Sequence, residues 1–469
     1  MKKEMKLGVY IESGLQDWQV IQQKDGVGAA ELYGKYYKEQ NREACEIWSR
    51  LASEITGESI IPWKKARILD DEKWMIILEG IPAGGPYRVE TCMKNGTASS
   101  FQEALRGDMI HQVYVGDLFV IAGQSNAAGY GKDPVEDGPE LGVSLFGQRG
   151  IWELASHPLN DSTDSIYEQI TERMNPGRSP YLHFAKYYKR ISGIPVGLIQ
   201  TALGASPVSR WNPEENGDLY QNMREMIKKA SDGRIAGMLW YQGCAEAVAL
   251  ETEHYGKRFS HMIKSFREEF GRIPVFACQI GRLTGNTSEA SDRAWNQIRE
   301  AQRRVAAELD GIYLIPTLDA ELSDQIHISS LSGLKIGERL ARAALYILKS
   351  RPFHWQAPEI AEACLRGQNL KLTFDQVGEE LFSMGADAND NGFRAEDDRG
   401  RILFEEYSCS GNTIFLRLER KPEGKCLISF GYGQDPKGVF PVDTGNHYPP
   451  TAFWRMPVEE CMEGNAYEI

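Results

Sequence analysis

The sequence predicts an α/β protein whose central domain, residues 111–350, holds a mostly parallel sheet covered on both faces by helices. Short apolar runs such as "DLFVIAG", "VGLIQTALG" and "MLWYQG" alternate there with amphipathic helical patterns. Strands of a parallel sheet are buried on both faces, so they read as continuous apolar runs. Apolar residues recur at helical spacing from Tyr255 to Phe270, and "AWNQIREAQRRVAAELDG" repeats this pattern with Gly311 as a stop signal.

Two β-rich regions flank this domain. Residues 1–110 alternate in a strand-like way, and in "EACEIWSRL" one face carries Cys45, Ile47 and Leu51. Turn signals such as "KDG" and "AGGPY" punctuate these runs at intervals typical of a small β-sandwich. Residues 351–469 return to short runs such as "LKLTF" and "TIFLRLE", so we expect a C-terminal β-rich, sandwich-like domain.

The composition narrows the classes of partner. A formal net charge of -13 over 469 residues argues against a nucleic-acid backbone or an anionic membrane as partner. No apolar run reaches the roughly 20 residues of a membrane span. The start, "MKKEMKLGVYIESG", has no apolar segment behind its basic residues. We therefore expect no secretory signal and a cytoplasmic protein, with a trimmed leader as the open alternative.

Histidines and cysteines are too dispersed for a metal centre. The 8 histidines show no spacing typical of zinc ligands, so we expect no metal and no cofactor. The 8 cysteines include no close pair, which favours free thiols over a disulfide framework. They are Cys45, Cys92, Cys244, Cys278, Cys364, Cys409, Cys426 and Cys461.

Small and polar residues follow the predicted strands where each strand ends. Gln124-Ser125-Asn126 follow one strand, residues 204–206 and 242–243 follow two others, and Asp319 follows a fourth. Ligands of open parallel sheets bind beyond these carboxyl ends. A serine on a tight turn there has the exposed hydroxyl and free N–H that a nucleophile needs. The alternative is an ordinary exit from strand to loop.

The segment "LSDQIHISSLSGLKIGERLARAAL" supplies a candidate base for this serine. Asp324 precedes His327 by three residues, directly before an amphipathic helix that either Ser329 or Ser330 is expected to cap. In a turn, the carboxylate can accept a bond from one imidazole nitrogen, which leaves the other nitrogen to take a proton. The alternative is a histidine that only forms a local hydrogen bond.

Several segments together resemble a known family. "VGDLFVIAGQSNAAGYG" resembles the first block of the SGNH hydrolases, in the branch of sialate O-acetylesterases and acetylxylan-type carbohydrate esterases. "SPYLHFAKYYKRISGIPVGLIQTALGASPVSRW", "MLWYQGCAEA" and "DQIHISSLSGLKIGERLA" resemble the later blocks, and "EGIPAGGPYRVET" resembles the preceding β-domain of sialate O-acetylesterases. The resemblance implies a three-layer α/β/α domain that removes O-acetyl groups from sugars, with an acetylated carbohydrate as partner.

Position by position, the resemblance also implies catalytic roles. Ser125 matches the nucleophile, His327 the general base and acid, and Asp324 the orienting carboxylate. The oxyanion positions match the backbone N–H groups of Ser125 and Gly204 and the side-chain amide of Gln242. Loss of one such donor typically costs about 3 kcal/mol of transition-state stabilisation.

One position departs from the family pattern. The usual "WYQGE" reads "WYQGC" here, so Cys244 stands at the acidic position and Glu246 is the nearest carboxylate. In a loop Glu246 could stand in, whereas in an extended segment the offset moves the carboxylate by several ångströms. Cys244 is expected to be a small half-buried filler, because nothing nearby indicates a lowered thiol pKa.

Residues beside the motifs are weaker candidates for binding the sugar. Flat aromatic faces suit the C–H faces of a sugar ring, and packing at the sheet edge is their alternative. Arg210 could pair with a sialic-acid carboxylate or bond to a loop carbonyl. The candidates are Gln124, Asn126, Tyr130, Arg210, Trp211, Tyr241 and Glu246.

Two other functions stay open beside a carbohydrate O-acetylesterase. A catalytically impaired carbohydrate-binding relative would fit the change at Cys244, but a pure binder has no need for both Ser125 and His327. A serine esterase acting on another small acyl ester is the third hypothesis. A lipase would carry an apolar lid near the nucleophile, whereas "AAGYGKDPVEDGPELG" is polar and glycine-rich, which favours a small hydrophilic substrate.

Overall fold

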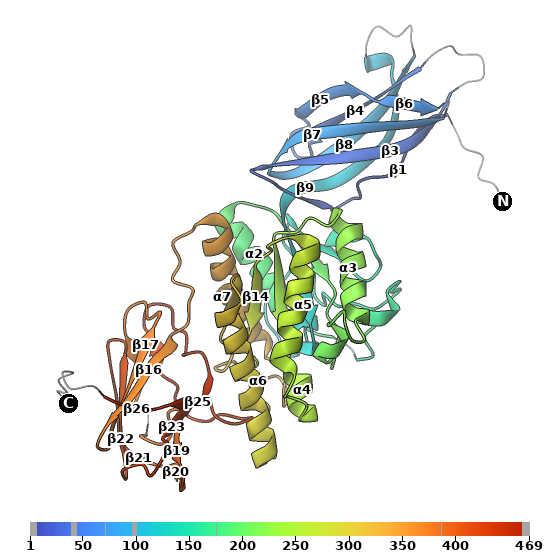
Figure 1. Cartoon of the computed structure of the whole chain (residues 1–469). Coiled ribbons are helices and arrows are strands. Elements are labelled where there is room, and N and C mark those ends of the chain that lie inside the picture. Colours follow the sequence, from blue (N-terminus) through green and yellow to red (C-terminus); the bar gives the residue numbers. More distant parts are fainter. Residues whose placement is uncertain are drawn as a thin grey trace.

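The computed structural model describes residues 7–38, 45–70, 72–95, 101–174, 176–385 and 387–461. Figure 1 shows a central body of helices around a sheet, with β-rich regions at its two ends. Three separate hydrophobic cores correspond to the three parts. The limits predicted at 110 and 350 stay a prediction, and one strand, β9, runs across the first of them.

The central sheet is parallel along most of its width. Its strand order is β11-β10-β12-β9-β13-β14-β15, and within this path only the β10–β11 pair is antiparallel. Four of these strands, β10 and β12 to β14, are buried at every position, as expected for strands covered on both faces. The strands are β9 (Leu105–Gly123), β10 (Val143–Phe146), β11 (Trp152–Leu154), β12 (Val196–Gln200), β13 (Gly237–Tyr241), β14 (Val275–Cys278) and β15 (Ile312–Ile315).

Helices lie on both sides of this sheet, and Figure 1 shows β14 between α7 and α5. Helices α2 and α7 pack against each other, and α5 packs against α6. The predicted helical patterns are confirmed as α5 and α6, and Ser329 caps α7 by accepting from the Ser332 N–H. The helices are α1 (Ser125–Ala128), α2 (Pro180–Ser192), α3 (Asp218–Ser231), α4 (Cys244–Ala249), α5 (Tyr255–Phe270), α6 (Glu289–Glu308) and α7 (Ser330–Lys349).

The N-terminal region is built from two sheets around their own apolar core. One sheet has the order β1-β3-β7-β6, and the other joins β5, β4 and β8 to the first half of β9. Ile47 and Leu51 lie in this core, with Cys45 partly buried against it, as their alternation predicts. The strands are β1 (Gly8–Ser13), β2 (Val20–Gln22), β3 (Val27–Tyr37), β4 (Cys45–Ser53), β5 (Ser59–Lys65), β6 (Arg67–Asp70), β7 (Lys73–Pro82) and β8 (Gly84–Asn95).

The C-terminal region is also β-rich and is tied to α6. The buried guanidinium of Arg299 donates to the carbonyl oxygens of Gly431 and Gly433 at 2.9 and 2.6 Å. The strands are β16 (Glu359–Arg366), β17 (Asn369–Asp375), β18 (Leu381–Phe382), β19 (Phe393–Asp397), β20 (Gly400–Ile402), β21 (Phe404–Ser410), β22 (Thr413–Leu418), β23 (Leu427–Phe430), β24 (Val442–Asp443), β25 (Phe453–Pro457) and β26 (Glu459–Glu460).

The expectation that all cysteines are free thiols is wrong for one pair. Cys364 and Cys461 form a disulfide, with their Cα atoms 5.0 Å apart. Parallel pairing of β16 with β26 brings the two residues together, although 97 positions separate them in the sequence. The other cysteines are unpaired. Within the described parts of the chain, no helix is long and apolar enough to span a membrane.

Candidate active site

A cavity of the central domain opens at the carboxyl ends of its parallel strands. It has a volume of about 1110 Å³, slightly above the usual range of small-molecule sites. Ser125, Gly204 and His327 all line it, and they follow β9, β12 and β15 respectively. The structure thus brings the three motifs together at one sheet edge, where ligands of open parallel sheets bind.

Ser125 is placed by a sharp turn between β9 and α1. Gly123 adopts a φ of 126°, and a side chain there would collide with the backbone of Tyr241 on β13. The turn therefore needs glycine, which alone adopts this backbone conformation without strain. Ser125 begins α1, so its N–H belongs to the first helical turn, where backbone donors have no partner within the helix.

His327 and Asp324 form the expected hydrogen bond. Asp324 Oδ2 accepts from His327 Nδ1 at 2.7 Å, and Asp324 Oδ1 accepts from the backbone N–H groups of Ile326 and His327. Burial alone would raise the pKa of Asp324, but these hydrogen bonds outweigh it and hold the pKa below its ordinary value. The carboxylate thus stays charged and fixes the imidazole tautomer that leaves Nε2 unprotonated.

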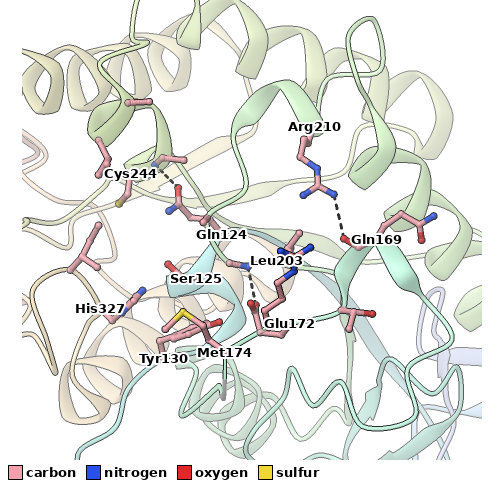
Figure 2. Close-up of a pocket in the computed structure, with 18 of the residues that line it drawn as sticks. Gln124, Ser125, Tyr130, Gln169, Glu172, Met174, Leu203, Arg210, Cys244 and His327 are labelled. Carbon is pink, nitrogen blue, oxygen red and sulfur yellow. Dashed lines mark hydrogen bonds between the residues drawn. The ribbon is translucent and has the colours of Figure 1, made fainter.

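The imidazole of His327 faces Ser125 (Figure 2). Figure 2 shows the His327 ring and the Ser125 side chain turned toward each other, and the Tyr130 ring stacks on the imidazole with centroids 4.8 Å apart. Both residues are described, and no hydrogen bond joins them in this structure. Such catalytic hydrogen bonds often form only when substrate binds. The arrangement can therefore activate a serine for attack on an acyl group.

Asn126 and Gln124, expected to contact the sugar, instead hold the turn that carries Ser125. Asn126 does not line the cavity, so that prediction is wrong. Its side chain donates to Ile326 O at 3.3 Å and accepts from the Ile328 N–H at 3.0 Å, which clamps the histidine loop against the serine turn. Gln124 does line the cavity, but its side-chain oxygen accepts from the N–H groups of residues 243 and 245.

The predicted oxyanion donors fare differently. The backbone of Gly204 faces the cavity, but its N–H donates to Glu172 Oε2 at 3.0 Å. Gln242 is fully buried and does not line the cavity, so its prediction as an oxyanion donor is wrong. The physical reason is Glu246, whose Oε2 accepts from Gln242 Nε2 at 2.6 Å, while Ser206 O accepts from the same nitrogen at 3.2 Å.

The Glu246 carboxylate, two residues beyond the usual acidic position, therefore has a structural role. Glu246 lies on α4 with 2% exposure and is not a substrate contact, contrary to expectation. Its Oε1 accepts from the Val208 N–H at 2.5 Å, so it anchors the segment that follows Gly204. Cys244 is buried at the cavity wall, and burial raises the pKa of its thiol to about 12, which fits a filler rather than a nucleophile.

Removing the Glu246 carboxylate is expected to loosen the Gly204 segment. Glu246→Ala leaves the Val208 N–H without its acceptor and the buried Gln242 amide with Ser206 O alone, which costs about 1–3 kcal/mol of unfolding free energy. We expect kcat/KM for an acetyl ester to fall about tenfold. Glu246→Gln, which keeps one acceptor oxygen, should recover most of the stability. Denaturant unfolding checks this, and an alanine variant as stable as wild type contradicts the anchoring role.

Trp211, Tyr241 and Arg210, the aromatic and arginine candidates, mostly have structural contacts in the protein. Trp211 and Tyr241 are fully buried and do not line the cavity, so both are wrong as sugar contacts. Trp211 donates to Ser206 Oγ, and the Tyr241 hydroxyl pairs with Thr317 Oγ1, each at 3.1 Å. Arg210 lines the cavity, but its guanidinium bonds Asp218 and the Gln169 carbonyl, so the loop-carbonyl alternative applies.

Sequence reasoning missed one wall of the cavity. Segment 168–174, which follows β11, supplies Gln169, Glu172 and Met174 to it (Figure 2). This segment carries neither a motif nor a periodic pattern. The one signal in the sequence is the position of the segment between β11 and α2, and this position does not tell which of its residues reach the cavity.

Comparisons with known proteins found one matching family model and several similar solved structures. The family model described as carbohydrate esterase, sialic acid-specific acetylesterase matches residues 115–346. A solved carbohydrate acetylesterase from Xanthomonas citri is 20% identical, with a TM-score of 0.64 over 95% of this chain and 99% of that one. A solved protein from Arabidopsis thaliana is 24% identical over 49% of this chain and 97% of that one, with a TM-score of 0.41. No curated protein matches the chain.

The Xanthomonas structure and the family model support different conclusions. The Xanthomonas structure has the same fold along nearly the whole chain, including both β-rich regions. The family match covers the central domain with every motif that meets at the cavity. Residues 115–346 therefore belong to the carbohydrate esterase family of sialic acid-specific acetylesterases.

Proposed function

We propose that the protein is a serine carbohydrate O-acetylesterase with Ser125, His327 and Asp324 as its catalytic triad. The observation that carries this proposal is the 2.7 Å bond from His327 to Asp324, with the imidazole facing Ser125 in one cavity. In the same proposal the central domain is a three-layer α/β/α domain of the SGNH type. The family match supports acetyl esters of sugars as the substrate class.

The geometry supports a two-step reaction. Ser125 Oγ attacks the acetyl carbonyl carbon while His327 Nε2 takes the hydroxyl proton, and Asp324 stabilises the imidazolium. The carbonyl oxygen becomes an oxyanion, for which the N–H groups of Ser125 and Gly204 are the proposed donors. The sugar oxygen leaves with the proton from His327, and an acetyl ester remains on Ser125. Water, deprotonated by His327, then releases acetate and restores the serine.

Acetate release from defined sugar esters tests the proposed function. We would incubate the protein with mono-O-acetylated xylosides, glucosides and N-acetylneuraminic acid and measure free acetate and free sugar. The expected result is equal amounts of both products from at least one ester, which also identifies the sugar. A folded protein that releases acetate from none of them, but still binds one, would instead fit a carbohydrate-binding relative.

A further inference from the structure

One donor proposed for the oxyanion is already occupied by a side chain of the protein. Glu172 Oε2 accepts the Gly204 N–H at 3.0 Å. A Cβ atom built on Gly204 would lie 3.1 Å from both carboxylate oxygens and 3.2 Å from the Tyr130 hydroxyl. Figure 2 shows the carboxylate beside Tyr130 and Leu203, with this bond as a dashed line. The carboxylate thus lies over the glycine backbone where an acyl oxygen is expected.

Neutral donors hold this carboxylate. Asn160 Nδ2 donates to Glu172 Oε2 at 3.3 Å, and the buried Asn160 is itself oriented by Gln148, whose Nε2 donates to Asn160 Oδ1 at 2.7 Å. Burial and the negative charge of Glu172 raise the pKa of Tyr130 well above its ordinary value. Among the described residues, no cationic side chain forms an ion pair with Glu172. An anion held by neutral N–H groups is the arrangement that an oxyanion hole provides.

The position has a consequence for substrate binding. A single backbone N–H cannot donate fully to Glu172 and to an acyl oxygen at once. The acyl oxygen must therefore displace the carboxylate, and hydrogen bonds that involve a charged acceptor are the strong ones. A substrate that offers the displaced Glu172 carboxylate a new hydrogen-bond donor therefore loses less binding free energy than a substrate that offers none. Sugar hydroxyls next to an acetyl ester are such donors.

We propose that Glu172 is a specificity-determining residue that withholds the Gly204 N–H from esters lacking a hydroxyl to bind its carboxylate. This inference rests on the proposed esterase function. In a matching substrate, a free sugar hydroxyl beside the acetyl group donates to Glu172 and draws it off Gly204. A simple acetyl ester offers Glu172 no replacement for the lost hydrogen bond. The state in which the Gly204 N–H is free for the acyl oxygen is then populated only in part, and the apparent affinity for the ester falls in proportion.

Two substrates and two variants test the proposal. We would measure kcat/KM of wild type, Glu172→Ala and Glu172→Gln on 4-nitrophenyl acetate and on a methyl xyloside with one acetyl group and a free neighbouring hydroxyl. In Glu172→Ala, kcat/KM should rise about tenfold for 4-nitrophenyl acetate and should not rise for the glycoside. Only 4-nitrophenyl acetate lacks a hydroxyl that binds the Glu172 carboxylate and so offsets its competition for the Gly204 N–H. Glu172→Gln should fall between. Equal factors on both substrates would overturn the proposal.

Acetate binding gives a readout that does not depend on turnover. Free acetate resembles the Glu172 carboxylate, so its dissociation constant measured by titration calorimetry should fall about tenfold in Glu172→Ala. Glu225→Gln removes the same charge from the exposed face of α3 and should change neither acetate binding nor the substrate ratio. An unchanged acetate affinity in Glu172→Ala overturns the proposal.

The outcomes separate this inference from the function on which it rests. If wild type turns over both esters while neither the substrate ratio nor acetate binding responds to Glu172, the esterase stands and the role of Glu172 is refuted. If no variant turns over either ester, the esterase proposal fails. Tighter acetate binding in Glu172→Ala would even then support Glu172 as an internal ligand of Gly204, and unchanged binding would refute it.

Discussion

Replacing Ser125 by alanine is expected to lower kcat for an acetyl ester by about 10⁴-fold or more, while KM changes little. In the proposed mechanism the Ser125 hydroxyl forms the acyl-enzyme, and alanine has no group that can attack the ester. The substitution should leave folding intact, because Ser125 is a small residue whose described contacts do not depend on its Oγ. Steady-state kinetics on 4-nitrophenyl acetate, with thermal unfolding of both proteins, provides the measurement.

A second serine, from a later block of the family resemblance, serves as the control. Ser209 lies in the segment that follows Gly204, outside the cavity, and Ser209→Ala should retain wild-type turnover. A Ser125→Ala protein that keeps more than about a hundredth of wild-type kcat would contradict the nucleophile assignment, because loss of the nucleophile of a catalytic triad lowers kcat by far more than that.

Asp324→Asn is expected to lower kcat by about 10³–10⁴-fold with little change in backbone structure. The asparagine oxygen can still accept the N–H groups of Ile326 and His327, so the turn should persist. The amide cannot, however, stabilise an imidazolium, and a reoriented amide group favours the wrong imidazole tautomer. Rates on 4-nitrophenyl acetate, with circular dichroism to check the fold, decide whether the carboxylate has this role.

The lowered pKa of Asp324 also predicts a pH dependence. Because its folded-state pKa lies below the unfolded value, ionised Asp324 contributes stability above the unfolded pKa, and this contribution disappears as pH falls through the folded pKa. The difference in Tm between wild type and Asp324→Asn should therefore be largest near neutral pH and shrink toward about pH 3. A difference that grows in acid would contradict the assigned direction.

A neighbouring aspartate separates loop order from catalysis. Asp133 accepts the N–H groups of Ser330 and Leu331 at the start of α7, at 2.9 and 3.3 Å, without contacting the imidazole. Asp133→Asn should loosen the same region yet lose no more than about tenfold in kcat. If it loses as much as Asp324→Asn, the effect of Asp324 is structural rather than electrostatic.

The sequence predicted those features that depend on a single strand or a single turn. Strands buried on both faces must be apolar throughout, so the runs at 118–122 and 237–241 predicted a covered parallel sheet, and the pairing confirms it. Asp324 and His327 are three residues apart, so a single turn determines their contact and the hydrogen bond could be expected. Ser125 follows from the place where a buried strand ends.

Features that depend on several segments were not predictable from spacing. Gln242 matched its motif, but Glu246 redirects its amide because α4 coils the chain directly after residue 243, and no extended-chain argument anticipates that. Glu172 lies in a segment without periodicity, and only the path of that segment over Gly204 gives it a partner. The disulfide depends on β26 pairing with a strand almost a hundred residues earlier.

The central claim is that Ser125 is an activated nucleophile, and covalent labelling tests it most directly. Wild type and Ser125→Ala would each be treated with a small organophosphate and analysed by intact mass, with peptide mapping of any product. The account predicts one adduct on wild type, located on Ser125, and none on the variant. An adduct that persists in Ser125→Ala, or a folded wild type that takes up no label while a known serine esterase beside it does, would contradict the claim.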